Sequence, residues 1–184
     1  MAQARGSHPA GEPGEGGPLL PTPGITGPRR QNLTNVLIIG GTATQREQVA
    51  RTFHRESPLR AGSFVRVDCG ADPDTLRSAL QAWRTAGGGS HTNPLAATET
   101  GTLYLDGVEE LPPDTQPLLL ALANRLQGEP TGTAERPCAG RLVTGNPRGL
   151  SQAVVEGRFD RALSDALDKV RVDLGPPAAA REGH

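Results

Sequence analysis

The chain has 184 residues, with 19 basic and 20 acidic side chains and a formal net charge of −1. This length suits one domain of ordinary size, or a smaller domain with tails, and excludes a large multidomain assembly. A charge so near zero gives no overall field that would attract nucleic acid or an anionic membrane. The apolar runs are too short to cross a bilayer and no signal-peptide pattern is present, so we expect a cytoplasmic protein without direct DNA or membrane binding.

Glycine and proline mark the ends of the predicted domain. They crowd the first thirty residues, where no apolar periodicity competes with them, so residues 1–34 are predicted to form a disordered arm. Residues 35–174 carry the apolar patterns of an α/β domain, and about 150 residues suffice to bury about 70% of their unfolded surface. Residues 175–184 are predicted to be a disordered tail.

Strand and helix patterns alternate from residue 36 onward. Residues 36–39 form a short apolar run closed by two glycines, which predicts a strand buried on both faces of a parallel sheet. Such alternation favours a right-handed, mostly parallel α/β sandwich. The next elements expected are a helix at 47–55, a strand at 64–69, and a helix capped near Asp72 with Leu76, Leu80 and Trp83 inward. A loop at 86–100 and a strand at 102–106 follow, and then a helix capped by Asp114 with Leu118, Leu119, Leu122 and Leu126 inward. The last elements are a strand at 141–144, two short helices, the first with Leu150, Val154 and Val155 inward and the second with Leu163, Ala166, Leu167 and Val170 inward, and a strand at 170–174.

The two cysteines, Cys69 and Cys138, lie far apart and have no CxxC spacing or histidine partner. We therefore expect buried thiols rather than a disulfide or a zinc site, and no metal centre elsewhere. His54 is interpreted as a packing or solvated residue, and Trp83 and Tyr104 as core anchors.

A set of short motifs, in a characteristic order, carries a family resemblance. The motifs are the turn at 40–47 in the place of a GxxxxGK phosphate loop, residues 49–51, His54, 57–58, 64–65, 101–106, Gln116 and 156–159. Over residues 36–174 the chain resembles the AAA+ central domain of sigma-54-dependent bacterial transcription activators. The resemblance implies a P-loop NTPase-like α/β subdomain, a three-layer sandwich with a mostly parallel five-stranded sheet. The sequence stops before the family's helical lid, so we expect no lid.

The resemblance also implies a nucleotide site, but this sequence departs from it. Gln45 replaces a glycine whose backbone turns toward the phosphates, and Arg46 replaces the lysine that meets the terminal phosphates. We expect these two side chains to leave no room for a triphosphate. Asn146 is either a nucleotide-sensing residue or a simple turn residue. The positions that correspond to the family's nucleotide contacts are Gly40, Gly41, Thr42, Ala43, Thr44, Gln45, Arg46, Glu47, Asp106 and Asn146.

Three further parts of the family's machinery are altered. Asp106 matches the magnesium-associated carboxylate, but Gly107 stands where a carboxylate would polarise water, and only Glu109 or Glu110 could reach back. Asp160 and Ala166 take the places of intersubunit arginines, with Arg161 one place off that register. The GAFTGA loop that touches sigma-54 is replaced by the glycine-rich segment 86–94.

These departures predict an inactive ATPase-like domain with no catalytic residue, no metal and no required cofactor. The leading hypothesis is a non-catalytic regulatory or protein-interaction module in bacterial transcription or signalling. Its partner would be a protein, and one candidate is an active AAA+ sigma-54-dependent activator whose ring it enters. One alternative is a vestigial ATP or ADP sensor, with or without Mg²⁺, and another is a degenerate remnant without a dedicated role. Partner contacts are expected at the arm and at the 86–100 loop.

Overall fold

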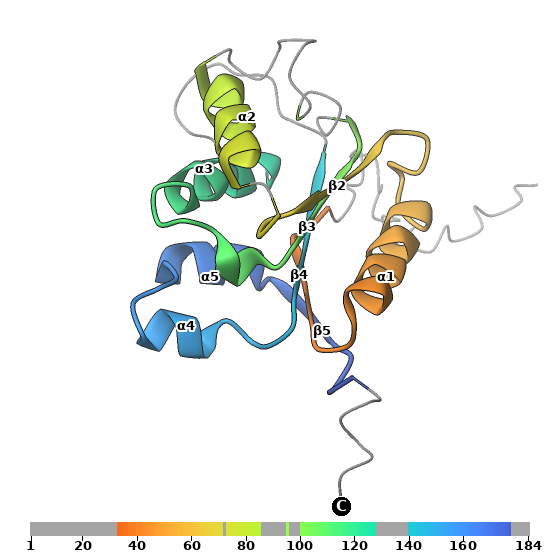
Figure 1. The fold of residues 1–184 in the computed structure, drawn as a ribbon. Coiled ribbons are helices and arrows are strands. Elements are labelled where there is room, and N and C mark those ends of the chain that lie inside the picture. Colours follow the sequence, from red (N-terminus) through yellow and green to blue (C-terminus); the bar gives the residue numbers. More distant parts are fainter. Residues whose placement is uncertain (1–32, 72, 86–94, 96–99, 128–139, 178–184) are drawn as a thin grey trace, which may run out of the picture.

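The computed structural model describes residues 33–71, 73–85, 95, 100–127 and 140–177. Five strands form one sheet in the order β2-β3-β4-β1-β5, and every neighbouring pair is parallel (Figure 1). The predicted five-stranded parallel sheet is therefore confirmed. The strands are β1 (Val36–Ile39), β2 (Phe64–Asp68), β3 (Thr102–Asp106), β4 (Arg141–Asn146) and β5 (Val170–Asp173).

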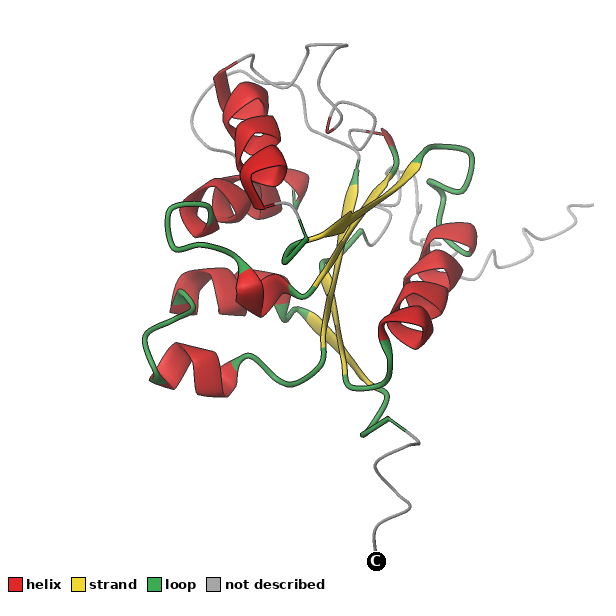
Figure 2. Cartoon of the chain, in the orientation of Figure 1, coloured by secondary structure: helices red, strands yellow, loops and turns green. Residues whose placement is uncertain are grey.

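Helices cover both faces of the sheet and make three layers. Helix α1 (Ala43–Arg55) lies alone on one face, as Figure 2 shows. The other face carries α2 (Pro73–Thr85), α3 (Gln116–Leu126), α4 (Ser151–Val155) and α5 (Arg161–Leu167). Side chains of β1 alternate between the layers, because Val36 and Ile38 pack with Ala50 of α1 whereas Leu37 and Ile39 pack in the larger core beneath the other helices.

The core contains most of the expected inward residues. Trp83 and Tyr104 are buried core anchors, as predicted, and Cys69 is a buried free thiol. Among the described residues no group of His, Cys, Asp or Glu side chains is arranged to hold a metal ion. No helix in the described ranges is long and apolar enough to span a membrane.

Several expected element boundaries were wrong. Helix α1 begins at Ala43 rather than at residue 47, because Thr42 caps it. Strand β4 runs on to Asn146, and β5 ends at Asp173. Val155 at the end of α4 is 81% exposed and so does not face the core.

Two other details of the sequence-based helices also differ. Asp114 does not cap α3, whose first residue is Gln116; its carboxylate instead accepts a hydrogen bond from Arg77 of α2 at 2.8 Å. This hydrogen bond lowers the pKa of Asp114. Val170 belongs to β5, not to the preceding helix, and is 40% exposed. The arm up to residue 32, Asp72, most of the 86–100 loop, Cys138 and residues 178–184 lie outside the described residues.

Candidate functional site

The candidate site lies at the carboxyl edge of the sheet, where β1, β3 and β4 end. Ile39 of β1 is in register with Asn146 of β4, and Asp106 of β3 is in register with Gly145. The turn from β1 into α1 follows directly on the same edge. Parallel pairing thus brings together residues near 40, 106 and 146 that are remote in sequence.

The turn after β1 depends on two glycines with left-handed backbones. Gly40 has φ 78° and Gly41 has φ 59°, a region that other residues adopt at a cost. A Cβ on Gly40 would also collide with the carbonyl oxygen of Gly175. The amide of Gly40 donates to the Asn146 carbonyl at 3.1 Å, and that of Gly41 donates to the Gly175 carbonyl at 2.8 Å. Both turn amides are therefore directed at protein acceptors.

The first turn of α1 is closed by a capping box. The amide of Gln45 donates to Thr42 Oγ1 at 3.2 Å, and the amide of Thr42 donates to Gln45 Oε1 at 2.8 Å. Gln45 is exposed, and its side-chain oxygen occupies the Thr42 amide.

Arg46 is the residue that fills the turn. Its side chain is 6% exposed, and its Nε and Nη2 donate to the two carboxylate oxygens of Asp106 at 2.8 and 3.1 Å. Its Nη1 donates to the carbonyls of Gly40 and Gly41 at 3.1 and 3.0 Å. Burial opposes the charged guanidinium, but the hydrogen bonds and charge of Asp106 outweigh that and raise the pKa of Arg46.

Asp106 has a third partner that the sequence analysis missed. Tyr104 Oη donates to Asp106 Oδ1 at 3.0 Å, and burial, followed by the Asp106 charge, raises the pKa of Tyr104. A Cβ at Gly145 would lie 2.5 Å from both Asp106 Oδ1 and Tyr104 Oη. The available signal was the spacing of residues 104 and 106, which places both side chains on one face of β3. We call Arg46, Asp106 and Tyr104 the Arg46 cluster.

Asn146 joins the ends of two strands. Its side chain is fully buried; Oδ1 accepts from the Glu109 amide at 3.3 Å, and Nδ2 donates to the Arg148 carbonyl at 2.8 Å. The side chain thus pairs with nearby backbone on both sides. These two hydrogen bonds hold together the loops that follow β3 and β4.

Two acidic residues, Glu109 and Glu110, follow β3 closely. Gly107 has φ 70° and precedes a short helical turn, Val108–Glu110. Glu109 pairs with Arg148 at 3.6 Å, and Glu110 lies against Gly70. A Cβ at position 107 would lie 3.6 Å from Glu110 Oε1, so the Glu110 carboxylate stands beside that position whereas Glu109 turns to Arg148.

The other candidate positions lie on the outer side of the turn. Ala43 and Thr44 are exposed, and their amides make no hydrogen bond within the described residues. Glu47 is half-buried and pairs with Arg51 at 2.7 Å and Arg66 at 3.1 Å. The amides of Ala43 and Thr44 are therefore available to a ligand.

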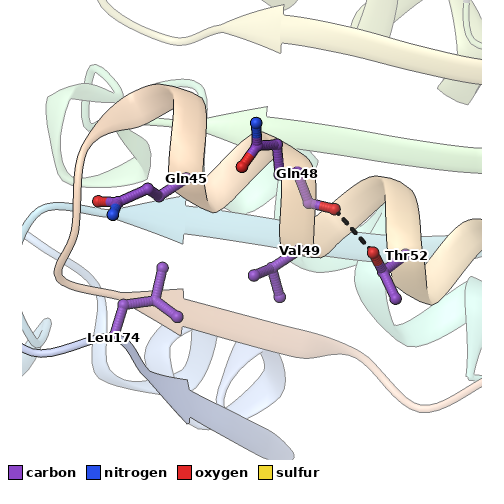
Figure 3. A pocket seen from close by; sticks show the side chains of 5 residues that line it. All are labelled: Gln45, Gln48, Val49, Thr52 and Leu174. Carbon is purple, nitrogen blue, oxygen red and sulfur yellow. Dashed lines mark hydrogen bonds between the residues drawn. The ribbon is translucent and has the colours of Figure 1, made fainter.

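An open hollow adjoins this end of α1. Figure 3 shows Val49 and Leu174 facing each other beneath the polar side chains, and the cavity volume is about 300 Å³. Thr52 Oγ1 donates to the Gln48 carbonyl at 3.0 Å. Among the described residues, the side chains that line this hollow are all uncharged; they are Gln45, Gln48, Val49, Thr52 and Leu174.

The segment between α4 and α5 is held by a buried glutamine. Gln116 Nε2 donates to the carbonyls of Leu111 and Arg158, both at 3.0 Å, and its Oε1 accepts from the Asp160 amide at 2.7 Å. Asp160 caps α5 by accepting from the Leu163 amide at 2.7 Å. The position expected for one intersubunit arginine is thus a helix cap. Ala166, at the other, is buried, whereas Arg161 is exposed.

A family model described as the sigma-54 interaction domain matches residues 28–173. The chain belongs to this family. It is 33% identical over 154 residues to the acetoin catabolism regulatory protein of Cupriavidus necator, covering 80% of this chain and 23% of that protein. It is 30% identical over 164 residues to the DNA-binding transcriptional regulator NtrC of Escherichia coli, covering 86% and 35%. The chain thus spans about a quarter to a third of these two relatives.

Solved structures confirm the AAA+ P-loop fold. NtrX from Brucella abortus in complex with ATP aligns with a TM-score of 0.64 and 26% identity, over 82% of this chain and 35% of that one. The P-loop NTPase domain of a sigma-54 transport activator from E. coli aligns with a TM-score of 0.50 and 20% identity, over 74% and 92%. The second likeness shows the fold alone.

The residues present at the carboxyl edge do not fit a magnesium-bound triphosphate. Such a ligand needs amide donors, a cation for the terminal phosphates and a carboxylate for the metal. Here the amides of Gly40, Gly41 and Thr42 already donate to protein acceptors. The cation, Arg46, and the carboxylate, Asp106, are paired with each other.

Proposed function

We propose that this domain is a non-catalytic regulatory module that acts through protein contacts and does not turn over ATP efficiently. The observation that carries the proposal is the forked pair between Arg46 and Asp106, at 2.8 and 3.1 Å. The pair joins Arg46, at the position of the family's phosphate-binding lysine, to Asp106, at the position of its magnesium-associated carboxylate. Hydrolysis also lacks a carboxylate at the family's position, because Gly107 has no side chain and Glu109 pairs with Arg148, which leaves Glu110, three residues on, as the one acidic side chain beside it.

The size of these defects supports the absence of useful turnover. A positioned acid or base contributes about 10²- to 10⁴-fold to a rate, and an arginine finger about 10³- to 10⁵-fold. Loss of the water-polarising group and of the intersubunit arginines together therefore removes about 10⁵-fold or more from the rate. Asp160 serves as a helix cap and Ala166 is buried, so neither replaces an arginine.

Nucleotide titration tests the catalytic part of the proposal. The wild-type chain is titrated with a fluorescent ATP analogue in Mg²⁺, and phosphate release is followed in parallel. We expect neither saturable binding below about 1 mM nor turnover. The matched control is Gln45→Gly/Arg46→Lys, which restores the family pattern and should bind nucleotide without hydrolysing it, because Gly107 remains. Wild-type binding at micromolar concentration, or measurable turnover, would contradict the proposal.

A fitting partner is an active AAA+ sigma-54-dependent activator. The resemblance places Asp160 and Ala166 where arginines would serve a neighbouring subunit, so insertion of this domain would leave that neighbour's site without them. The assay adds this chain to an active activator from the same cell and measures its ATPase rate. We expect the rate to fall as this chain is added, and the absence of association would exclude this partner.

Two substitutions at position 160 test whether the inhibition comes from the missing arginine in the activator's site or from an unspecific effect. Asp160→Arg supplies a guanidinium and should relieve the inhibition in part, whereas Asp160→Asn keeps the helix cap and should inhibit like the wild type. Equal inhibition by both variants would show that position 160 does not face the activator's site.

One observation favours a second candidate, a nucleotide sensor without hydrolysis. The exposed amides of Ala43 and Thr44 stand at the start of the thirteen-residue helix α1, and helix amino termini attract phosphate. A rise in melting temperature with ATP or ADP would support this candidate, because a ligand that binds only the folded state stabilises it. An unchanged melting temperature at millimolar nucleotide would exclude it.

A further inference from the structure

Each nitrogen of the Arg46 guanidinium donates to the protein, in four hydrogen bonds altogether. Nε and Nη2 bind Asp106, and Nη1 binds the carbonyls of Gly40 and Gly41, at distances from 2.8 to 3.1 Å. Both oxygens of Asp106 are occupied as well, Oδ1 by Arg46 and Tyr104 together and Oδ2 by Arg46. An anion that approached Arg46 would have to displace these bonds first.

Displacement is unfavourable because the pair is buried. The side chains of Arg46 and Asp106 are 6% and 5% exposed. Drawing Arg46 toward an external anion would leave a desolvated carboxylate with Tyr104 as its remaining donor. That carboxylate would also repel the incoming negative charge. The turn therefore disfavours anions even though it contains an arginine.

We propose that Asp106 is an autoinhibitory group that withholds Arg46 from phosphate-containing ligands. The inference rests on the proposed function, because it gives the physical reason why the turn stays closed to nucleotide. The effect of removing Asp106 is then expected to differ in sign from that of removing a magnesium-binding carboxylate, because loss of such a carboxylate weakens nucleotide binding. Here removal of the Asp106 charge frees Arg46 to join the exposed amides of Ala43 and Thr44 in binding phosphate.

The test uses the full chain and pyrophosphate, without Mg²⁺, in isothermal titration calorimetry. Asp106→Asn keeps the volume of the side chain and removes its charge. We expect it to bind pyrophosphate about 10- to 100-fold more tightly than the wild type, the factor that one hydrogen bond to a charged group contributes. Arg46→Met/Asp106→Asn should lose this gain. Binding by Asp106→Asn that equals that of the wild type, or a gain that persists in the double variant, would overturn the inference.

A second variant keeps the test decisive if Asp106→Asn does not fold, which circular dichroism would reveal. Arg46→Lys retains the charge but cannot make the forked pair, because an ammonium is a single point of charge. We expect it to bind pyrophosphate about 3- to 10-fold more tightly than the wild type, and no gain would count against autoinhibition. Failure here is distinct from failure of the proposed function, which would appear as ATP binding or turnover by the wild type.

Discussion

Replacing Arg46 by methionine isolates the contribution of the Arg46 cluster to stability. The substitution keeps a long apolar stem but removes four hydrogen bonds, two to Asp106 and one each to the carbonyls of Gly40 and Gly41. Asp106 would remain buried with the Tyr104 hydroxyl as its donor. Removing one partner of a buried ion pair costs about 3–5 kcal/mol, because the other charge stays desolvated.

Urea denaturation followed by circular dichroism measures this cost. A loss of about 4 kcal/mol raises the unfolding equilibrium constant about 10³-fold and, at about 2–4 °C per kcal/mol, lowers the melting temperature by about 8–16 °C. The control is Arg46→Met/Asp106→Leu, which removes both charges. Because an apolar pair of similar volume often matches a buried ion pair, we expect the double variant to be much closer to the wild type than the sum of the single losses.

Additivity would refute this account. If Arg46→Met and Asp106→Leu each cost less than about 1 kcal/mol, or if their losses summed in the double variant, the two side chains would not act as one buried unit. The pair observed at 2.8 Å would then contribute no more than an exposed ion pair, typically about 0–1 kcal/mol.

Three further expectations concern neighbouring residues. Gly145→Ala should destabilise the domain by about 1–3 kcal/mol in urea, because its methyl group would lie 2.5 Å from Asp106 and Tyr104, whereas Gly149→Ala, with open space around it, should be nearly neutral. Burial, followed by the charge of Arg51, lowers the pKa of His54, so the folded state favours the neutral ring. The free energy of unfolding should therefore fall as the pH drops from about 6.5 through the lower folded-state pKa. Urea denaturation between pH 7.5 and 5 should show a weaker pH dependence for His54→Gln than for the wild type. Burial, and then the charges of Asp68, Asp106 and Glu110, raises the pKa of the Cys69 thiol. In a Cys138→Ser background, Ellman's reagent should therefore react with Cys69 only after denaturation, and rapid labelling of the native protein would contradict its burial.

The sequence predicted the sheet because its central strands are buried on both faces. Continuous apolar runs at β1 and β3 need no alternation and end at residues with evident turn chemistry. The start of α1 was missed because the capping box at Thr42 and Gln45 overlaps the region read as a phosphate loop. Asp114 was misassigned because a carboxylate before a helix can equally pair with a remote arginine, here Arg77.

The candidate site was only half predictable. Gln45, Arg46 and Gly107 could be recognised as departures, since each changes the chemistry of a known position. The sequence could not show that Arg46 pairs with Asp106, because the two lie 60 residues apart and meet only through the order of strands β3, β4 and β1. Tyr104 was assigned to the core, which is correct, but its hydroxyl points to Asp106.

The departures from the family pattern also serve the fold in which they stand. Gln45 completes a capping box that a glycine would lose, and Arg46 satisfies two carbonyls and a buried carboxylate that a lysine could not bind in the same way. Gly107 has φ 70°, where a glutamate would cost about 1–2 kcal/mol. Restoring any one family residue therefore weakens a local contact before it adds a working catalytic group. If the proposed function holds, hydrolysis would require all three changes together and the intersubunit arginines as well, because the side chains present at this edge of the sheet stabilise one another.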